Sequence, residues 1–310
     1  MGFLNQLRYR GEAGFLLALI IGKLKVFFYF CLFSDTYYIK KQFKKTFGYE
    51  LDLENPITLN EKMQWLKLHD RNPLNTLCAD KLAVREYVAQ KAGKEVLIPL
   101  LFHTSDYREI KPENLPDIPF IIKATHTAGT NHIVWDKNKA DWARIRKDCR
   151  WWLHKNYYYP EKEWQYKNIK PQIVVEKLLT NAQGEIPSDY KLHYFNGRFG
   201  CLQVDIDRFT NHKRNFYDED WRLLPFTWSI HKNGRPVWDN GRPIEKPEKL
   251  REMISLGEKL AAPFRYTRID LYLLGQKFFF GEITFHHGGG FEHFEPFDWD
   301  KNFGEKVSIK

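Results

Sequence analysis

The stretch RIDLYLLGQKFFFGE, from Arg268 to Glu282, decides the fold prediction because it reads as two strands around a short turn. Residues 268–274 and 277–283 are rich in apolar, aromatic and β-branched side chains, and Gly275-Gln276 lies between them, so we predict a β-hairpin. Asp270 and Glu282 are twelve residues apart in the sequence. The hairpin would therefore place these two acids near one level on facing strands.

Two facing carboxylates repel one another, so a sequence usually keeps them together only with a positive charge between them. A divalent metal is the simplest candidate. Mg²⁺ binds one or two protein carboxylates and completes its shell with water and substrate phosphate, which indicates a nucleotide. Arg268 lies two residues before Asp270, on the same strand face, where a guanidinium could bind a phosphate. These residues alone leave open the alternative of a surface hairpin with solvated charges.

The composition indicates a globular protein that attracts acidic partners. Of the 310 residues, 43% are hydrophobic and 28% are charged, and the length allows two or three lobes. A net charge of +9 favours nucleotides, anionic lipid, acidic glycan or nucleic acid, and 16% aromatic residues favour strand-rich, saccharide-facing or membrane-facing surfaces. Cys31, Cys78, Cys149 and Cys201 are widely spaced, so we expect no zinc site, no disulfide framework and a reducing cytoplasm.

The N-terminal segment from Gly14 to Phe33 is largely apolar. We expect it not to span a membrane, because Lys23 and Lys25 at its centre would each cost about 2.5–3.5 kcal/mol in a bilayer. No small-residue cleavage site follows the apolar run, which argues against a signal peptide. Two interpretations remain open: an interfacial helix whose basic residues meet anionic headgroups, and a helix packed on the body of the protein.

Two helices are predicted between residues 55 and 93. Thr58 and Glu61 match a capping box for the first helix, and apolar residues follow at helical spacing. The second helix is expected to begin at Asp80-Lys81 and to end at Gly93. Lys81 would then lie in its first turn, where N–H groups and a lysine together form an anion site; an ordinary solvated lysine is the alternative.

A second hairpin is predicted within PFIIKATHTAGTNHIVW, residues 119–135. Its apolar runs flank a loop of small polar residues, Thr125 to Asn131, and Lys123 ends the first strand facing this loop. The loop matches no standard phosphate-binding motif, but its amides and hydroxyls could approach a phosphate closely. The loop residues that would do so are Thr127, Ala128, Gly129 and Thr130.

Two features near this hairpin have competing interpretations. His126 and His132 could bind a metal, although histidines near strands are more often satisfied core or surface groups. The aromatic, basic segment WWLHKNYYYPEKEWQYK, which begins at Trp151, is either a platform for sugar rings or a helix followed by a loop packed between lobes.

The segment IVVEKLL, from Ile173 to Leu179, predicts a short buried strand that carries one carboxylate. A carboxylate in a buried strand needs a partner, so Glu176 would meet the amino group of a nucleotide base, a neighbouring lysine or a backbone amide. Further along, DYKLHYF alternates, which places Asp189, Lys191 and His193 on one strand face, and an Asn-Gly turn leads into another antiparallel strand.

These motifs follow one another in a specific order. This order of motifs resembles that of the ATP-grasp superfamily. The motifs are a DK pair, a strand-ending lysine before a small-residue loop, VVEKLL, DYKLH, and RxD with GExT twelve residues later. More closely, the chain resembles the TupA-like ATP-grasp family of cell-surface polysaccharide synthesis. The segments that carry this resemblance are NPITLNEKMQWLKLHDRNP, ADKLAVREYV, VVEKLL, DYKLHYFNG and RIDLY with GEITF. The resemblance covers about Leu51 to the C-terminus. Each motif alone is weakly specific, but five in this order are strongly specific.

The resemblance implies a nucleotide site. Lys81 and Lys123 would contact the phosphates, Lys123 would also act in catalysis, and the loop residues Thr127, Gly129 and Thr130 would close over them. The residues implied at the adenine and the ribose are Glu176, the backbone near Lys177 and Leu178, Asp189 and Lys191.

The resemblance also implies a metal and a catalytic residue. Asp270 and Glu282 would hold Mg²⁺, and Arg268 would stabilise the acyl-phosphate transition state. Many ATP-grasp enzymes have Asn two residues after the second acid, where this chain has Thr284. A hydroxyl can still bind Mg²⁺ or hold its water, so Thr284 stays a metal-ligand candidate, while a second metal ion is less certain. The following HHGGGFEHFEPFDWD is expected to form a substrate loop, with His286 and His287 as weak candidates for it.

The expected activity follows from the family. ATP-grasp enzymes typically activate a carboxylate as an acyl phosphate and let an amine attack it. TupA-like proteins are associated with attaching amino acids or amines to uronic-acid-containing surface polymers. The resemblance therefore implies an ATP- and Mg²⁺-dependent carboxylate–amine ligase of bacterial capsule, O-antigen or teichuronic-type synthesis, acting on an acidic glycan or lipid-linked precursor. It would be cytoplasmic, at the inner leaflet if its basic, apolar N-terminus binds lipid, and without a nucleic-acid partner.

Two alternatives to the ligase are carried forward. A glycosyltransferase of the same pathway would need a nucleotide-sugar site, commonly DxD on a doubly wound sheet, and the DxD at Asp205–Asp207 lacks a βαβ context. A non-catalytic binding protein with a decayed ATP site is disfavoured by the retained lysines and acids.

The expected fold is α+β, an ATP-grasp fold whose two lobes with antiparallel sheets clasp ATP after a helical N-terminal region. The expected boundaries are a basic, apolar segment at 1–50, a helical lobe at 51–118, a small lobe with the phosphate loop at 119–182, and a large lobe with the metal site and substrate loop at 183–310.

Overall fold

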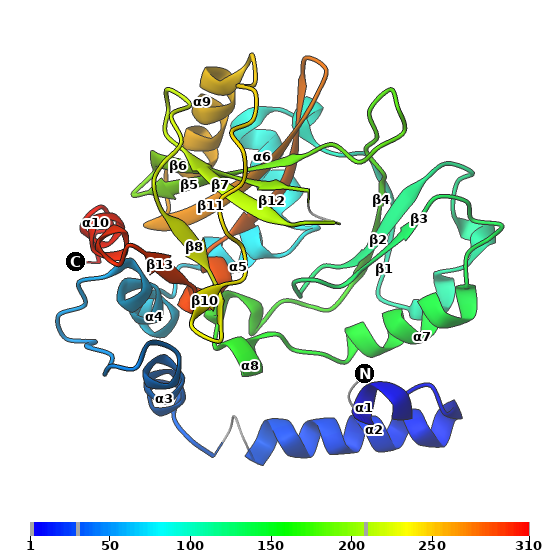
Figure 1. Cartoon of the computed structure of the whole chain (residues 1–310). Coiled ribbons are helices and arrows are strands. Elements are labelled where there is room, and N and C mark those ends of the chain that lie inside the picture. Colours follow the sequence, from blue (N-terminus) through cyan, green and yellow to red (C-terminus); the bar gives the residue numbers. More distant parts are fainter. Residues whose placement is uncertain (1–2, 29–31, 208–209, 310) are drawn as a thin grey trace. The chain divides into compact units, whose positions relative to one another are not determined.

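A computed structural model of the protein describes residues 3–28, 32–207 and 210–309 (Figure 1). The chain forms two compact units, and each unit is built from three separate stretches of sequence. Unit 1 comprises Met1–Ile39, Arg71–Ala83 and Ile98–Leu178. Unit 2 comprises Lys40–Asp70, Val84–Leu97 and Leu179–Lys310. Helix α3 (Asp35–Phe47) contains the first boundary between them.

Unit 1 contains a four-stranded antiparallel sheet in the order β1-β4-β2-β3. Its strands are β1 (Leu100–Thr104), β2 (Phe120–Ala124), β3 (Asn131–Val134) and β4 (Ile173–Lys177). Its helices are α1 (Phe3–Leu7), α2 (Gly11–Val26), α5 (Pro73–Ala79), α7 (Trp142–Leu153) and α8 (Tyr158–Glu161), with short 3₁₀ turns η3 (Tyr107–Glu109), η4 (Pro112–Asn114) and η5 (Trp164–Tyr166). The predicted hairpin at residues 119–135 is confirmed as β2 and β3, with Ile121 opposite Ile133.

The core of unit 1 lies between the sheet and helix α7. Alternate residues of β2, namely Phe120, Ile122 and Ala124, are fully buried and belong to the same hydrophobic cluster as Trp151 and Trp152 of α7. Of the two interpretations of the aromatic segment, the structure bears out the helix of the second, since residues 151–153 end α7 and the short turns α8 and η5 follow. The two tryptophans are buried because they supply apolar area to this core.

Helix α2 packs on unit 1 through only one narrow face. Phe15 and Ala18 are buried, and the Phe15 ring meets Trp151 edge-on at a centroid distance of 6.0 Å. Leu19 and Ile21 are partly buried against the same core, whereas Leu16, Leu17, Ile20 and Leu24 are 47–56% exposed. Residues 29–31 of the apolar stretch, Cys31 included, lie outside the described residues. Among the described helices, none has the length and apolar character that crossing a bilayer requires.

Unit 2 contains a five-stranded antiparallel sheet in the order β12-β11-β5-β6-β7. Its strands are β5 (Asp189–Phe195), β6 (Arg198–Ile206), β7 (Lys213–Tyr217), β11 (Tyr266–Leu274) and β12 (Lys277–Thr284). Two small sheets join β8 (Thr227–Ser229) to β13 (His293–Glu295) and β9 (His231–Lys232) to β10 (Arg235–Pro236). Its helices are α4 (Leu59–His69), α6 (Val84–Ala92), α9 (Leu250–Ala261) and α10 (Asp298–Glu305), with 3₁₀ turns η2 (Lys94–Val96) and η6 (His287–Gly290).

Both hairpins predicted in unit 2 are confirmed. β11 and β12 pair around Gly275-Gln276, and β5 and β6 pair around Asn196-Gly197, where both residues have positive φ as a tight hairpin turn requires. Helix α9 packs on β5, β6 and β11 (Figure 1). Aromatic residues from β7, β8 and α10 belong to a hydrophobic core that includes Trp228 and Phe303.

The first predicted helix is confirmed and the start of the second is wrong. Thr58 Oγ1 accepts from the Glu61 N–H, and the Glu61 carboxylate accepts from the Thr58 N–H, so α4 begins with the predicted capping box. The second helix, α6, begins at Val84 instead of Asp80. The Asp80 carboxylate accepts from the Leu82 and Ala83 N–H groups, which closes a local turn in place of the first helical turn.

Candidate functional site

The hairpin of unit 2 places Asp270 directly opposite Glu282. A regular register starting from the Leu274–Lys277 pair would place Asp270 opposite Gly281, but a β-bulge after Asp270 shifts the pairing by one residue. A Cβ at Gly281 would lie 3.1 Å from both the Asp270 carbonyl oxygen and Tyr272 Cε2, which is tighter than an ordinary contact. The bulge therefore brings the two acids to one level.

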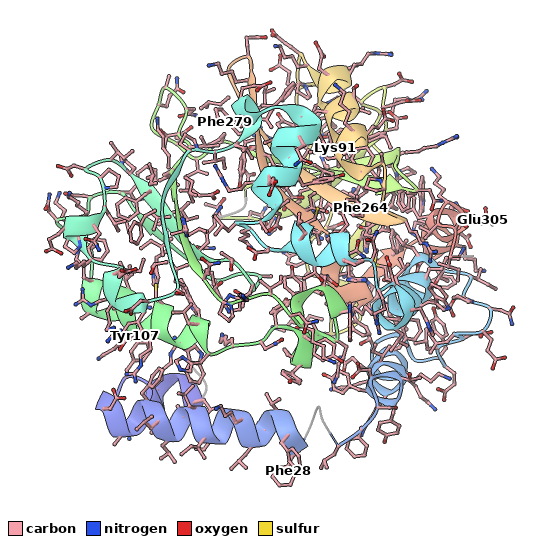
Figure 2. The ribbon with its side chains drawn as sticks, turned by 180° about the vertical axis from the view of Figure 1, so that it is seen from behind. Phe28, Lys91, Tyr107, Phe264, Phe279 and Glu305 are labelled. Atoms are coloured by element: carbon pink, nitrogen blue, oxygen red, sulfur yellow. The ribbon has the colours of Figure 1, made fainter. Side chains whose placement is uncertain are left out.

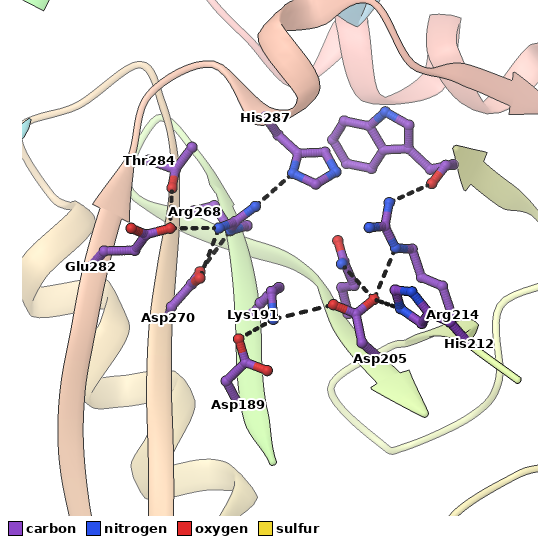
Figure 3. A network of polar contacts seen from close by, with 12 residues as sticks. Asp189, Lys191, Asp205, His212, Arg214, Arg268, Asp270, Glu282, Thr284 and His287 are labelled. Atoms are coloured by element: carbon purple, nitrogen blue, oxygen red, sulfur yellow. Dashed lines mark hydrogen bonds and ion pairs between the residues drawn. The ribbon is translucent and has the colours of Figure 1, made fainter. Parts of the chain in front are cut away.

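The guanidinium of Arg268 lies between these two carboxylates (Figure 3). Its Nε donates to Asp270 Oδ1 at 2.6 Å, and its Nη2 donates to Asp270 Oδ2 at 2.7 Å and to Glu282 Oε1 at 3.0 Å. Arg268 is 9% exposed and Asp270 is 5% exposed, whereas the side chain of Glu282 is 40% exposed. The positive charge expected between the acids is thus supplied by the chain itself, and Glu282 keeps a solvent-facing side.

Burial and charge act in opposite directions on these groups. Burial raises the pKa of Asp270 to about 6, although Arg268 and Lys191 lower it. Burial also lowers the pKa of Arg268, but Asp270 and Glu282 raise it further above its ordinary value, so the guanidinium stays charged.

The donor set at this hairpin fits Mg²⁺. Asp270, Glu282 and Thr284 offer two carboxylates and one hydroxyl, which are the hard oxygen ligands that Mg²⁺ prefers, and Thr284 Oγ1 donates to Glu282 Oε1 at 3.4 Å. Among the described residues no cluster of three or more His, Cys, Asp or Glu side chains could hold a metal. A metal here would therefore complete its coordination with water and substrate oxygens, as Mg²⁺ commonly does.

Strands β5 to β7 carry further charged side chains, some of which were not among the predicted site residues. Lys191 forms an ion pair with Asp189 and lies 3.3 Å from Asp205 Oδ2. Arg214 Nε donates to Asp205 Oδ1 at 3.0 Å, and the His212 Nε2 atom lies 3.1 Å from the same oxygen (Figure 3). Burial alone would raise the pKa of Asp205, but Arg214 and Lys191 hold it well below its ordinary value.

Sequence reasoning did not assign Asp205 or Arg214 to the site. Asp205 stands in β6 and Arg214 in β7, opposite one another in the strand register. The only signal for them was strand alternation, since Gln203 and Asp205 occupy the face that Lys191 and His193 occupy on the neighbouring strand.

Unit 1 brings Lys123 and Glu176 together. Lys123 Nζ donates to Glu176 Oε2 at 2.9 Å, because β2 and β4 are neighbours and Ile121 is opposite Glu176. Of the partners considered for the Glu176 carboxylate, a neighbouring lysine is therefore present. Lys177 and Leu178 follow directly, and their N–H groups donate to the carbonyl oxygens of Pro99 and Pro119.

The loop from Thr125 to Asn131 is held to Lys81. The Lys81 N–H donates to the Thr125 carbonyl at 3.2 Å, and Lys81 Nζ donates to the Thr127 carbonyl at 2.7 Å. The Thr127 and Thr130 hydroxyls are hydrogen-bonded to each other, and Gly129 has φ +67° with open space where a Cβ would lie. Lys81 thus lies beside the predicted phosphate loop, although it is not in a helical turn.

The two histidines that flank this loop are held by helix α7. His126 Nε2 lies 2.9 Å from the Trp152 carbonyl oxygen, and burial lowers its pKa. His132 Nε2 lies 3.0 Å from Asp148 Oδ2, and its ring stacks on Trp152. Both are held by contacts within unit 1, as the more ordinary of the two interpretations expects, although His126 Nδ1 is buried without a hydrogen-bond partner among the described residues.

The predicted site residues thus form two sets. Unit 1 holds Lys81, Lys123, Thr127, Gly129, Thr130, Glu176, Lys177 and Leu178, and unit 2 holds Asp189, Lys191, Arg268, Asp270, Glu282 and Thr284. Each set combines cations with hydrogen-bonding groups, and the unit 2 set adds facing acids. Such sets suit phosphate binding and hard-metal binding, respectively.

Comparison with known proteins gives a family match over most of the chain. The model of a family described as TupA-like ATPgrasp matches residues 61–308. No curated protein matches the sequence.

Several solved structures are similar to this chain at low sequence identity. D-alanine–D-alanine ligase from Bacillus anthracis is 14% identical, with 67% of this chain and 57% of that chain covered and a TM-score of 0.38. ATP-grasp ligase PsnB with a variant of its minimal precursor, Mg and ADP is 12% identical, with 81% and 62% covered and a TM-score of 0.41. D-alanine–D-alanine ligase from Helicobacter pylori is 14% identical, with 80% and 69% covered and a TM-score of 0.39. The chain spans less than two thirds of the length of the first two.

Proposed function

We propose, from the premise that this chain belongs to the TupA-like ATP-grasp family, that it is an ATP- and Mg²⁺-dependent carboxylate–amine ligase. The observation that carries the proposal is the Asp270–Glu282 pair with Arg268 beside it, inside the part of the chain that matches the family. An acid pair with one solvent-facing member suits a divalent metal, and a buried, charged guanidinium suits a phosphoryl group.

The residues of unit 1 would bind the nucleotide. Lys81 and Lys123 would contact the phosphates, and the Thr125–Asn131 loop would supply amides and hydroxyls to them. Glu176 and the backbone of Lys177 and Leu178 would contact adenine. In unit 2, Asp189 and Lys191 would contact the ribose side of the nucleotide.

The reaction would proceed in two transfers. A substrate carboxylate oxygen attacks the γ-phosphorus of ATP, the bond to the bridging oxygen breaks, and ADP leaves. An amine then attacks the acyl carbon, phosphate leaves, and the amine loses a proton. Bound Mg²⁺ would neutralise charge on the phosphate oxygens. Arg268 would stabilise the negative charge on the transferring group, and Lys123 would orient the phosphates, so positioning supplies most of the catalysis.

The proposed substrates are a uronic-acid-containing bacterial surface polysaccharide or its lipid-linked precursor, and an amino acid or other amine. The family association supports the glycan, and a net charge of +9 suits an acidic polymer. The buried, free thiols of Cys78, Cys149 and Cys201 suit a reducing cytoplasm as the place of action.

We further propose that the protein binds the cytoplasmic face of the inner membrane through helix α2. Leu16, Leu17, Ile20 and Leu24 are 47–56% exposed, and Lys23 and Lys25 are exposed on the same helix. Phe28 projects from the end of this segment (Figure 2). Apolar side chains flanked by lysines match a helix that lies in the headgroup region of an anionic leaflet.

The structure gives less support to a glycosyltransferase. Asp205 and Asp207 form the DxD sequence, but β6 belongs to an antiparallel sheet, and Asp205 is engaged by Arg214 and Lys191. We therefore propose the ligase alone.

The test is ADP formation by the purified chain with Mg-ATP, a uronate glycan and candidate amines, with the product identified by mass. We expect ADP only with all components present, and about a hundredfold loss of rate in Asp270→Asn and in Glu282→Gln. Asp220→Asn, at an exposed acid of unit 2, should keep the wild-type rate. Turnover of a sugar nucleotide without ATP would overturn the proposal.

A further inference from the structure

The hydrogen bonds of Arg268 leave one guanidinium hydrogen without a described acceptor. A guanidinium has five N–H groups. Three of them donate to Asp270 and Glu282, as described above, and Nη1 donates to His287 Nδ1 at 2.8 Å. Among the described residues, the second Nη1 hydrogen has no acceptor. Because the guanidinium is planar and rigid, the direction of this hydrogen follows from the contacts that hold the whole group, and the His287 contact is the one at Nη1.

The tautomer of His287 follows from this contact. A guanidinium can only donate, so Nδ1 of His287 must present its lone pair, and the proton of the neutral ring must be on Nε2. Glu292 Oε2 lies 3.1 Å from Nε2, where a carboxylate favours a proton on that nitrogen. Glu292 is itself held by Arg214, whose Nη1 donates to the same oxygen at 3.0 Å.

The turn that carries His287 is built to keep this arrangement. Gly288 has φ +55°, and a Cβ there would lie 2.4 Å from Glu292 Cγ, so only glycine lets Glu292 approach His287. Lys67 Nζ donates to the Gly289 carbonyl at 2.6 Å and Gln64 Nε2 donates to the Gly290 carbonyl at 2.7 Å, which anchors the turn to α4. His287 is 3% exposed. Its ring therefore has little freedom to turn.

We infer that His287, whose Nδ1 accepts from Arg268 and whose Nε2 faces Glu292, is a positioning residue that helps to aim the remaining Nη1 hydrogen of Arg268 at the transferring phosphoryl group. The inference rests on the proposed function and names a residue outside the site assigned above. Three of the four Arg268 contacts involve Asp270 and Glu282, on the Nε and Nη2 side, so they fix the plane of the guanidinium. Among the described residues, His287 is the acceptor at Nη1. Nη1 is also the nitrogen that would donate its remaining hydrogen to the phosphoryl group.

The kinetic test is a double-mutant cycle on the rate of ADP formation. His287→Leu removes the acceptor, whereas His287→Asn keeps an oxygen near the Nδ1 position. We expect His287→Leu to lower kcat about tenfold with little change in the KM for ATP, and His287→Asn to retain most of the rate. In an Arg268→Met background, His287→Leu should cause no further loss, because a residue that acts through Arg268 has nothing left to position.

A purely structural role would give a different pattern. In that case His287→Leu would lower kcat by the same factor in the wild-type and Arg268→Met backgrounds. Such independent effects would overturn the inference. His103→Leu, at an exposed histidine of unit 1, is the control and should leave kcat unchanged. Thermal melting of every variant separates loss of folding from loss of positioning.

A second measurement does not depend on activity. In ¹⁵N-histidine-labelled protein, with the His287 signals assigned by comparison with His287→Asn, we expect the neutral Nε2–H tautomer, and a shifted Nδ1 resonance in Arg268→Met. A proton on Nδ1 would exclude the contact and overturn the inference. If the wild-type chain forms no ADP, the ligase proposal fails, and this measurement still decides whether His287 holds Arg268.

Discussion

Asp270 pairs with Glu282 across β11 and β12 only because the strand bulges at Gly281. In a regular register without the bulge, Asp270 would be opposite Gly281, and Glu282 would point to the other face of the hairpin, since side chains alternate along a strand. The acid pair is therefore a property of the register as much as of the two acids.

We expect Gly281→Ala to weaken the binding of Mg-ATP. A Cβ at this position would lie 3.1 Å from the Asp270 carbonyl oxygen, so the bulge must move by a few tenths of an ångström and carry Glu282 with it. The expected cost is roughly 1–3 kcal/mol in stability, as for other overpacked sites, with a several-fold rise in Kd measured by calorimetry. Gly22→Ala, where no atom lies near the added Cβ, is the control. Unchanged Mg-ATP affinity in Gly281→Ala would show that the register does not matter.

Lys123→Met should lower both stability and ATP affinity. The Lys123 side chain is 18% exposed and that of Glu176 is 9% exposed, so the change removes a cation from beside a buried carboxylate at a cost of about 3 kcal/mol. The double variant Lys123→Met/Glu176→Gln should recover most of the stability, measured by urea unfolding, but not the affinity for ATP. Lys139→Met, at a lysine side chain that is 85% exposed, should change neither. Recovery of ATP binding in the double variant would remove Lys123 from the proposed site.

The stability of the protein should contain a pH-dependent contribution from Asp300. This carboxylate accepts from the Asn60 N–H and Nδ2, but burial raises its pKa from 3.8 to about 6. The folded state then holds the proton more tightly than the unfolded state, so the group contributes stability that is fully present below about pH 4. That contribution is lost as the pH rises through 6, and it amounts to about 3 kcal/mol.

Asp300→Asn should remove this dependence. Urea unfolding at several pH values between 4 and 7 should show wild type losing stability relative to the variant as the pH rises. Asp298→Asn, at an exposed acid of the same helix, should run parallel to wild type. Parallel curves for Asp300→Asn as well would mean that Asp300 ionises normally in the fold.

Replacing Leu17 and Ile20 together by Gln should reduce binding to anionic vesicles. These side chains are 47% and 56% exposed, and each would transfer part of its apolar area into the headgroup region. Sedimentation with vesicles of phosphatidylglycerol and phosphatidylcholine should show a loss of at least about tenfold in affinity. Binding of wild type should also weaken with salt, because Lys23 and Lys25 contribute. Ile57→Gln, at a residue that is 60% exposed in unit 2, is the control, and equal binding of the α2 variant and wild type would exclude α2 as the contact.

The sequence predicted local features well. The two hairpins of unit 2 could be predicted because Gly275-Gln276 and Asn196-Gly197 separate alternating apolar runs. A hairpin pairs residues that are close in sequence. The cap of α4 was readable for the same reason, since Thr58 and Glu61 bond within one turn. The family resemblance is confirmed by the match over residues 61–308.

Other features depend on contacts that are distant in sequence. The sequence around Asp80 predicted the first turn of a helix, but the Asp80 carboxylate accepts from the Leu82 N–H and closes a local turn instead. Which of these two local structures forms depends on the rest of the fold. Arg214 bonds to Asp205, nine residues away, but also to Glu292, which is 78 residues away, so no spacing rule connects the three. His287 was readable as a polar residue in a substrate loop, but its bond to Arg268 spans 19 residues and depends on the glycine turn.

The interleaving of the two units limits how the protein can be dissected. The chain passes from one unit to the other after Ile39, Asp70, Ala83, Leu97 and Leu178, so no single gene fragment encodes either unit alone. A truncation after Asp70, Ala83 or Leu97 divides both units between the two products, whereas a truncation after Ile39 or Leu178 divides one unit. Recombination that exchanges such a unit as a block between homologous genes would need several simultaneous crossovers, which favours inheritance of the two units together.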